Sequence, residues 1–188
     1  MTQTFLQNGW MHRYASLRNA QAHSLALPKT FQAVIVDTPC SSGSVHSPYK
    51  QPVGSRLARQ ALATQYEKPQ PSPIATAVVA VAVGKITVTV GGLEQGSGLE
   101  ALTTSSTFGF EALGADGLWH STPVEAIAAS TVTLSGVPAG AKAVRYLWRS
   151  TPCGPLTFGC PVYLKVTALG ALTGQHDYLP LAPFVLAL

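Results

Sequence analysis

The sequence predicts an α/β segment followed by an all-β antiparallel sandwich, and three observations lead to this prediction. Before residue 66, helical patterns alternate with one short apolar run. A stretch with three prolines in five residues follows, which is typical of a stiff, extended linker. After it, apolar residues recur with a period of two, as in half-buried strands. We therefore expect an α/β part at 1–66, a linker at 67–73 and a sandwich at 74–188.

The first part has the order helix, strand, loop, helix. Residues 10–27 carry apolar or small side chains at helical spacing, and Pro28 ends that pattern. Residues 31–36 (FQAVIV) form a short apolar run typical of a buried parallel strand, with Asp37 directly at its end. After a loop rich in Ser, Gly and Pro, residues 48–65 again follow a helical spacing, and Pro48 suits a first turn. This order is typical of the end of an α/β sheet domain.

The second part consists of short alternating runs separated by Gly- and Pro-containing turns. In one run Ile86, Val88 and Val90 alternate with threonine, and Gly91-Gly92 ends it. Other runs place apolar residues two apart in the same way: Val79, Val81 and Val83; Phe108 and Phe110; Val132 and Leu134; Val144, Tyr146 and Trp148. Short strands with regularly spaced turns predict an antiparallel sandwich.

Composition excludes several classes of protein. Hydrophobic residues make up 46% of the 188 residues and charged residues 11%, which favours a packed globular chain over disorder. The net charge of +4 is scattered, so no nucleic-acid-binding surface is predicted. No apolar run reaches the ~18 residues that a membrane-spanning helix needs. The first thirty residues contain no apolar core of a signal peptide, which would favour the cytoplasm only if the sequence were complete.

Two segments contain several motifs in a fixed order. In residues 27–63 a Pro28-Lys-Thr30 turn precedes the run ending in Asp37, and Gly43-Ser-Val-His46 and a helix with Lys50-Gln-Pro-Val-Gly-Ser-Arg56-Leu57 follow. The motifs of residues 144–184 are Val144-Arg-Tyr-Leu-Trp148, Cys153, Cys160-Pro-Val-Tyr163 and Leu179-Pro-Leu-Ala-Pro-Phe184. Together they resemble the sialate O-acetylesterase family, a branch of the SGNH-type hydrolases. The family usually has proline directly after the histidine, where this chain has Ser47.

The resemblance implies a fold and an activity. Residues 1–66 would be the C-terminal fragment of an SGNH-type hydrolase domain, and residues 74–188 an accessory β-sandwich. The complete enzyme would hydrolyse O-acetyl esters of sialic acid or related carbohydrates, without a metal or organic cofactor, in an extracellular or lysosomal compartment. The family's nucleophilic serine and oxyanion-hole residues belong to an N-terminal half that these 188 residues do not contain. The chain would then need that half, and would be inactive alone. The alternatives are a non-catalytic carbohydrate-binding or scaffold module, or a fragment without an independent function.

His46 is the candidate general base. Its imidazole can take a proton from a serine hydroxyl near neutral pH and return it to the leaving sugar oxygen. Asp37 is the candidate acid that would hold the imidazole in the correct tautomer. Many SGNH enzymes place that acid three residues before the histidine, where this sequence has Gly43. Two alternatives are therefore open: Asp37 caps backbone amides at a strand end, or a backbone carbonyl orients His46, which could also be an ordinary loop histidine.

The three cysteines form an odd set. Cys153 and Cys160 enclose a short loop with Gly154, Pro155 and Gly159 that could bring the two sulfurs together, so they are either a disulfide or two reduced thiols. A disulfide would leave Cys40 outside the pair and would suit an oxidising compartment. The spacing of His and Cys predicts no metal site.

Overall fold

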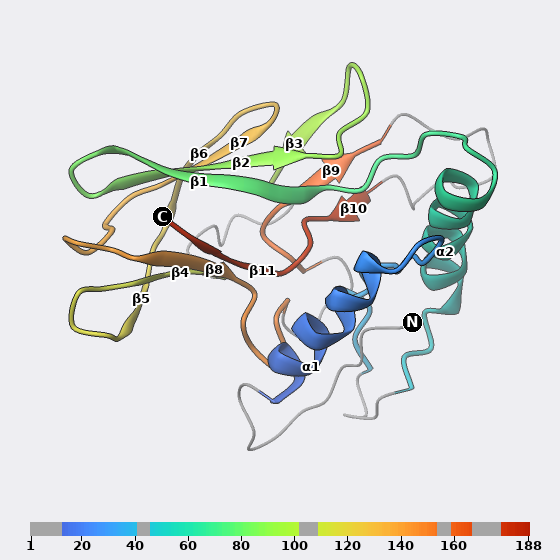
Figure 1. Ribbon diagram of the computed structural model, residues 1–188, viewed down its shortest axis with the longest axis horizontal. Helices are drawn as coiled ribbons and strands as arrows, with labels where there is room; N and C mark the ends of the chain where they lie inside the picture. Colours follow the sequence, from blue (N-terminus) through green and yellow to red (C-terminus); the bar gives the residue numbers. More distant parts are fainter. Residues whose placement is uncertain (1–12, 41–45, 102–108, 154–158, 167–177) are drawn as a thin grey trace.

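The fold is mainly antiparallel β-sheet. The computed structural model describes residues 13–40, 46–101, 109–153, 159–166 and 178–188. The strands form three sheets with the orders β1-β2-β7-β6, β11-β8-β4-β5 and β10-β9-β3, and all pairings are antiparallel. The two four-stranded sheets form facing layers, and the helices lie at one end, on the side of β9 and β10 (Figure 1).

The helices precede the strands along the chain. They are α1 (Arg13–Ala22), the short 3-10 helix η1 (His23–Ala26) and α2 (Lys50–Gln65). The strands are β1 (Ile74–Ala82), β2 (Lys85–Gly91), β3 (Gly98–Glu100), β4 (Phe110–Leu113), β5 (Trp119–Ser121), β6 (Val124–Ile127), β7 (Thr131–Leu134), β8 (Ala143–Tyr146), β9 (Tyr163–Lys165), β10 (Tyr178–Pro180) and β11 (Phe184–Ala187).

The alternation seen in the sequence explains how β2 packs. Ile86, Val88 and Val90 are buried on one face, while the intervening residues are partly exposed. Val88 lies opposite Val132 of β7, so two β-branched side chains meet within the core. β1 and β2 are joined through Gly84, whose φ of +71° is a backbone conformation that favours glycine.

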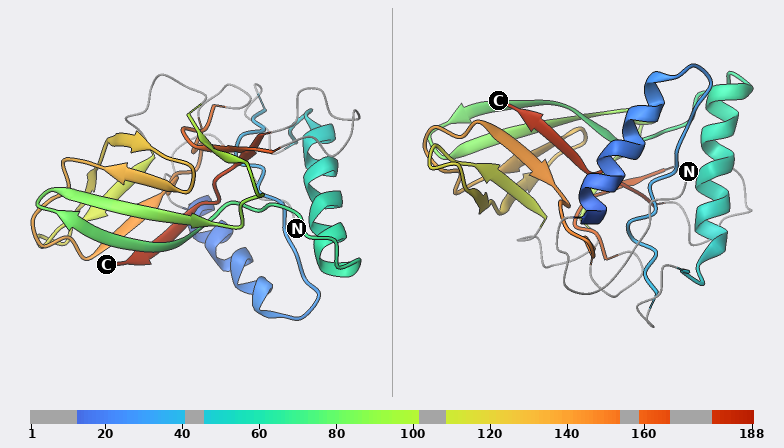
Figure 2. Two further views of the ribbon diagram at one scale, coloured as in Figure 1. Left: turned by 90° about the horizontal axis from the view of Figure 1, so that it is seen from above. Right: turned by 60° about the horizontal axis from the view of Figure 1, so that its bottom comes forward.

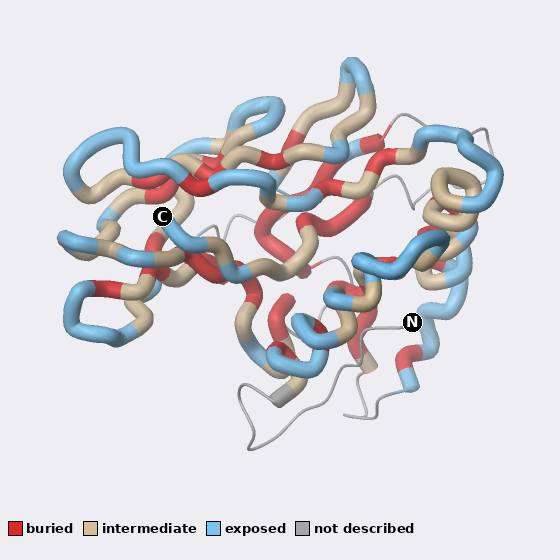
Figure 3. The backbone as a smooth tube through the Cα atoms, viewed as in Figure 1, coloured by how far each residue is buried: buried red, intermediate tan, exposed pale blue. Residues whose placement is uncertain are grey.

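Aromatic rings fill part of the space between the two layers. The ring centroids of Phe110 and Tyr146 are 4.3 Å apart, and those of Tyr146 and Phe184 are 5.8 Å apart. Phe110 and Tyr146 are completely buried. Such rings combine a large buried apolar area with favourable ring–ring contacts. The end of the molecule formed by α1, α2 and the segment between them is called the helical end. The buried segments concentrate between the sheets and toward the helical end, as the red tube in Figure 3 shows.

The prediction of an α/β fragment followed by a sandwich is wrong, because the fold is β-rich and no parallel sheet occurs among the described residues. Residues 31–36 do not form a strand, and only Ala33 makes an isolated bridge. Ala33, Ile35 and Val36 are nevertheless buried, and Val36 joins the core cluster of the sheets. A parallel strand needs neighbours to pair with. The described residues supply none, so the run buries its side chains as an extended segment between α1 and α2 (Figure 2).

Several local predictions agree with the structure. α2 lies within the predicted helix at 48–65, and α1 with η1 lies within the predicted helix at 10–27, whose first residues are outside the described part. Cys153 and Cys160 form a disulfide with a Cα–Cα distance of 4.3 Å, which confirms the pairing and excludes the alternative of two thiols. The division into 1–66, 67–73 and 74–188 stays a prediction. β1 begins directly after the proline-rich stretch.

Candidate functional site

Asp37 is the centre of a buried polar network at the helical end. Its side chain is completely buried, and the guanidinium of Arg56 on α2 binds it with two hydrogen bonds. Nη1 donates to Oδ1 at 2.6 Å and Nη2 to Oδ2 at 2.8 Å. This two-point geometry is the strong form of an arginine–carboxylate pair, and it offsets part of the cost of burying both charges.

Arg56 also connects three parts of the chain. Its Nη1 donates to the carbonyl of Val34 at 2.9 Å, and its Nη2 donates to the carbonyl of Tyr178 at 3.2 Å. These contacts fix α2 to the segment that precedes Asp37 and to the first residue of β10. Arg56 is buried, with 6% of its surface exposed, and it joins the helical end to the sheets.

Tyr163 links the same network to the disulfide loop. Its hydroxyl donates to Oδ2 of Asp37 at 3.2 Å and accepts a hydrogen bond from the backbone N–H of Cys160 at 3.1 Å. Burial, together with the negative charge of Asp37, raises the pKa of Tyr163 far above its ordinary value. The hydroxyl therefore stays protonated and donates to Asp37 throughout the physiological pH range.

His46 lies on the surface, at the end of the loop that starts after Asp37. Its side chain is exposed. The next residue, Ser47, is buried, and its hydroxyl donates to the carbonyl of Pro39 at 3.4 Å and accepts from the N–H of Tyr49 at 3.2 Å. These contacts close the loop at its base and set the start of α2. Residues 41–45, which include Gly43, lie outside the described residues.

The exposed imidazole of His46 and the buried carboxylate of Asp37 are both groups that can take part in acid–base chemistry. An exposed imidazole can reach a substrate, and an ionised carboxylate has room for further donors besides Arg56 and Tyr163. The N–H and the hydroxyl of Thr38, the residue after Asp37, both donate hydrogen bonds to the carbonyl of Ile35. The catalytic roles of His46 and Asp37 stay predictions.

Neither a metal centre nor a membrane span is found in the parts of the chain that the structure describes. Within these ranges no group of three or more His, Cys, Asp or Glu side chains could hold a metal ion. No helix within the same ranges is long and apolar enough to cross a membrane.

The structure resembles a solved enzyme. It superposes with a TM-score of 0.75 on a carbohydrate acetylesterase from Xanthomonas citri, with 28% sequence identity. The match covers 98% of this chain and 40% of the other, so the chain spans about two fifths of that enzyme's length. The chain is related to a carbohydrate esterase. No family model matches the sequence, and no curated protein matches it. The narrower resemblance to sialate O-acetylesterases is therefore not established by these comparisons.

The burial of three arginines at this end of the molecule was not predicted from the sequence. Arg18, Arg56 and Arg59 are almost completely buried. The Nη2 atom of Arg18 donates to the carbonyls of Leu147 and Arg149, on the segment that follows β8, and burial lowers the pKa of Arg18 to about 10. One signal was available. Pro52, Arg56 and Arg59 follow the i, i+4, i+7 spacing of a single helix face, and that face is the buried one.

Proposed function

We propose that this chain supplies the histidine-bearing part of an enzyme that removes O-acetyl groups from carbohydrates, with O-acetylated sialic acid as one candidate substrate. The observation that carries the proposal is the similarity to a carbohydrate acetylesterase over 98% of the chain. The ordered motifs around His46 and Cys160 point in the same direction, because they resemble those of sialate O-acetylesterases.

In this proposal His46 is the general base and Asp37 the carboxylate associated with it. The exposure of His46 and the closure of its loop by Ser47 support the first assignment. The second assignment rests on the position of Asp37 directly before the loop that ends at His46, and on the ability of an aspartate to stabilise an imidazolium. Arg56 and Tyr163 then act as positioning residues that hold Asp37 in place.

The nucleophile and the oxyanion donors would come from a further polypeptide segment. Acyl transfer needs a nucleophile, a general base and oxyanion donors. The sequence contains no strand-to-helix turn that would present a serine as the nucleophile. The chain alone would then be inactive. An extracellular or lysosomal location belongs to the same proposal, and the disulfide is compatible with it.

A chimera tests the proposal. The matching two fifths of the Xanthomonas citri enzyme are replaced by this chain, and the folded product is assayed with a chromogenic acetyl ester and with O-acetylated sialic acid. We expect turnover that His46→Ala abolishes, while His23→Ala, which removes another exposed histidine, leaves it unchanged. A folded chimera whose turnover survives His46→Ala would contradict the role of His46.

The same chimera separates the two roles considered for Asp37. If Asp37 orients the base, Asp37→Asn should lower kcat by about 10⁴-fold while the fold is retained, by analogy with other triads. If Asp37 is only structural, the paired replacement Asp37→Leu with Arg56→Met should restore turnover together with stability.

A further inference from the structure

A hollow beside α2 is lined by a buried arginine that forms no ion pair with any other described residue. The hollow is partly open to solvent, has a volume of about 20 Å³, and lies between α2, the proline-rich stretch and β10. Arg59 lines it and is only 4% exposed. Among the described residues, Arg59 forms no ion pair, and its Nη2 atom is buried without a hydrogen-bond partner.

The neighbouring charges do not compensate this guanidinium. Arg56 also lines the hollow, but both of its terminal nitrogens are committed to Asp37. The ion pair of Arg56 with Asp37 has no net charge, so among the described residues that line the hollow Arg59 carries the positive charge that no carboxylate compensates. A buried charge is costly unless a partner of opposite charge binds it. The hollow therefore has the electrostatic character of an anion site.

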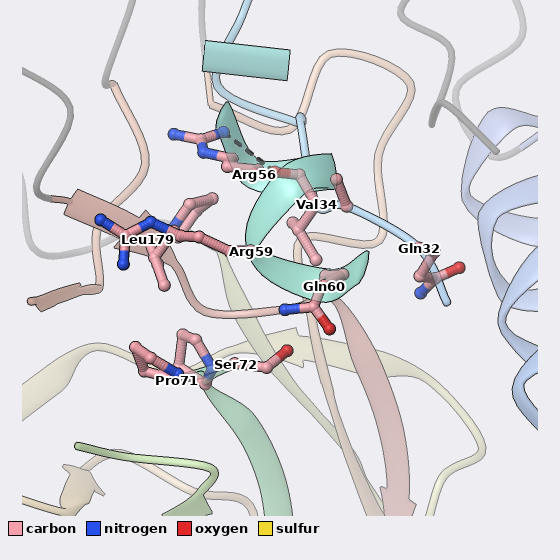
Figure 4. Close-up of a pocket in the computed structure, with 11 residues that line it drawn as sticks. Gln32, Val34, Arg56, Arg59, Gln60, Pro71, Ser72 and Leu179 are labelled. Carbon is pink, nitrogen blue, oxygen red and sulfur yellow. Dashed lines mark hydrogen bonds between the residues drawn. The ribbon is translucent and has the colours of Figure 1, made fainter. Parts of the chain in front are cut away.

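The walls of the hollow indicate what kind of anion fits. Gln60 and Ser72 supply additional polar groups, whereas Val34, Leu179 and Pro71 supply apolar surface. Arg56 and Arg59 extend from α2 toward the same side, and Gln60 points toward Ser72 (Figure 4). A guanidinium next to apolar walls suits a carboxylate that carries a short apolar tail.

We propose that this hollow binds a small monocarboxylate, with its oxygens accepting hydrogen bonds from Arg59 and its tail against Val34 and Leu179. The site is independent of the esterase activity proposed above, because it uses neither His46 nor a serine. A ligand of so few atoms can bind only weakly, so a dissociation constant in the millimolar range is expected.

Titration with sodium acetate tests the site, followed through backbone amide resonances of α2 and β10. Sodium chloride at the same ionic strength and acetamide, the neutral analogue, are the reference ligands. We expect saturable changes with acetate alone. Arg59→Gln should weaken binding by about tenfold or more, because a charged hydrogen bond is lost. Lys50→Gln removes one positive charge from the exposed start of the same helix and should leave binding unchanged.

Three outcomes would overturn the proposal. They are no saturation with acetate, equal responses to acetate and chloride, or equal affinity in wild type and Arg59→Gln. Should Arg59→Gln fail to fold, Arg59→Lys keeps the charge but loses the planar fork, and it should bind acetate more weakly than the wild type. Unchanged affinity in a folded Arg59→Lys variant would count against the proposed contact.

Discussion

The sheets and the helical end of this molecule differ in how many buried side-chain polar atoms have no hydrogen-bond partner. Among the described residues from β1 onward, the hydroxyl of Thr122, between β5 and β6, is the one buried side-chain nitrogen or oxygen atom without a hydrogen-bond partner. The remaining atoms of this kind in the described residues belong to Arg18, Gln21, Gln32, Arg59 and Gln70. Native structures rarely leave such groups unsatisfied. The difference indicates that the sheets are complete in themselves, whereas the helical end has unused capacity for polar contacts.

The two regions also differ in the contacts that hold them in place. The sheets are held together by backbone ladders and an apolar core that includes Phe110, Tyr146 and Leu134. The helical end is joined to them in part through arginine side chains that donate to backbone carbonyls, as Arg18 does to Leu147 and Arg56 to Tyr178. We therefore expect the sheets to determine global stability and the helical end to open locally.

The largest effect is expected in the sheets. Phe110→Ala should lower the free energy of unfolding by about 3–5 kcal/mol, because it leaves a cavity next to Tyr146 and Phe184. Chemical denaturation measures it. Leu118→Ala, at a side chain that is largely exposed, is the control and should change stability by less than about 0.5 kcal/mol. Equal effects of the two substitutions would mean that the core is not where we place it.

A smaller effect, local to the helical end, is expected from the Asp37–Arg56 pair. Asp37→Leu leaves the buried guanidinium without a carboxylate and should cost roughly 3 kcal/mol, whereas adding Arg56→Met should recover most of the loss. Hydrogen exchange should show faster opening of α2 with little change in β2. The exposed pair Lys85–Glu125 is the control, and breaking it should cost less than about 1 kcal/mol. A double variant no more stable than Asp37→Leu would contradict this account.

The smallest effect concerns Tyr163 and depends on pH. Because its pKa is raised in the folded protein, its contribution to stability is fully present below the ordinary value of 10.0 and is lost as the pH rises above it. Tyr163→Phe should cost about 1 kcal/mol at neutral pH through the lost hydrogen bond to Asp37. Above pH 10 the difference between the two proteins should narrow. Thermal unfolding at several pH values measures this, with Tyr66→Phe as an exposed control. A stability difference between the wild type and Tyr163→Phe that stays constant above pH 10 would argue against the raised pKa of Tyr163.

The sequence was a good guide wherever structure depends on near neighbours. The alternation of Ile86, Val88 and Val90 predicted β2 and its buried face. The helix predicted from Pro48 begins two residues later, at Lys50. The short loop between Cys153 and Cys160 allowed the disulfide that the structure contains. These features follow from side-chain periodicity and backbone restriction within a few residues.

The predictions of structure were wrong or incomplete where contacts between distant parts of the chain determine the local conformation. Ala33, Ile35 and Val36 of the apolar run at 31–36 are buried as expected, but burial does not reveal whether a strand partner exists. The contacts of Arg56 with Asp37 and Tyr178 span 19 and 122 positions, so no local pattern contains them. In β1, Val79 and Val81 are exposed and Val78 is buried, which shows that a period of two does not by itself identify the core face.

The central claim is that this chain carries the base of a carbohydrate esterase site but depends on another segment for the nucleophile. The most direct measurement is the hydrolysis of a chromogenic acetyl ester by residues 1–188 alone, with the active chimera as the positive control. We predict no turnover above that of buffer, in the wild type and in His46→Ala alike. Turnover by the isolated chain that disappears in His46→Ala and persists in His23→Ala would contradict the claim, because a complete active site would then lie within these 188 residues.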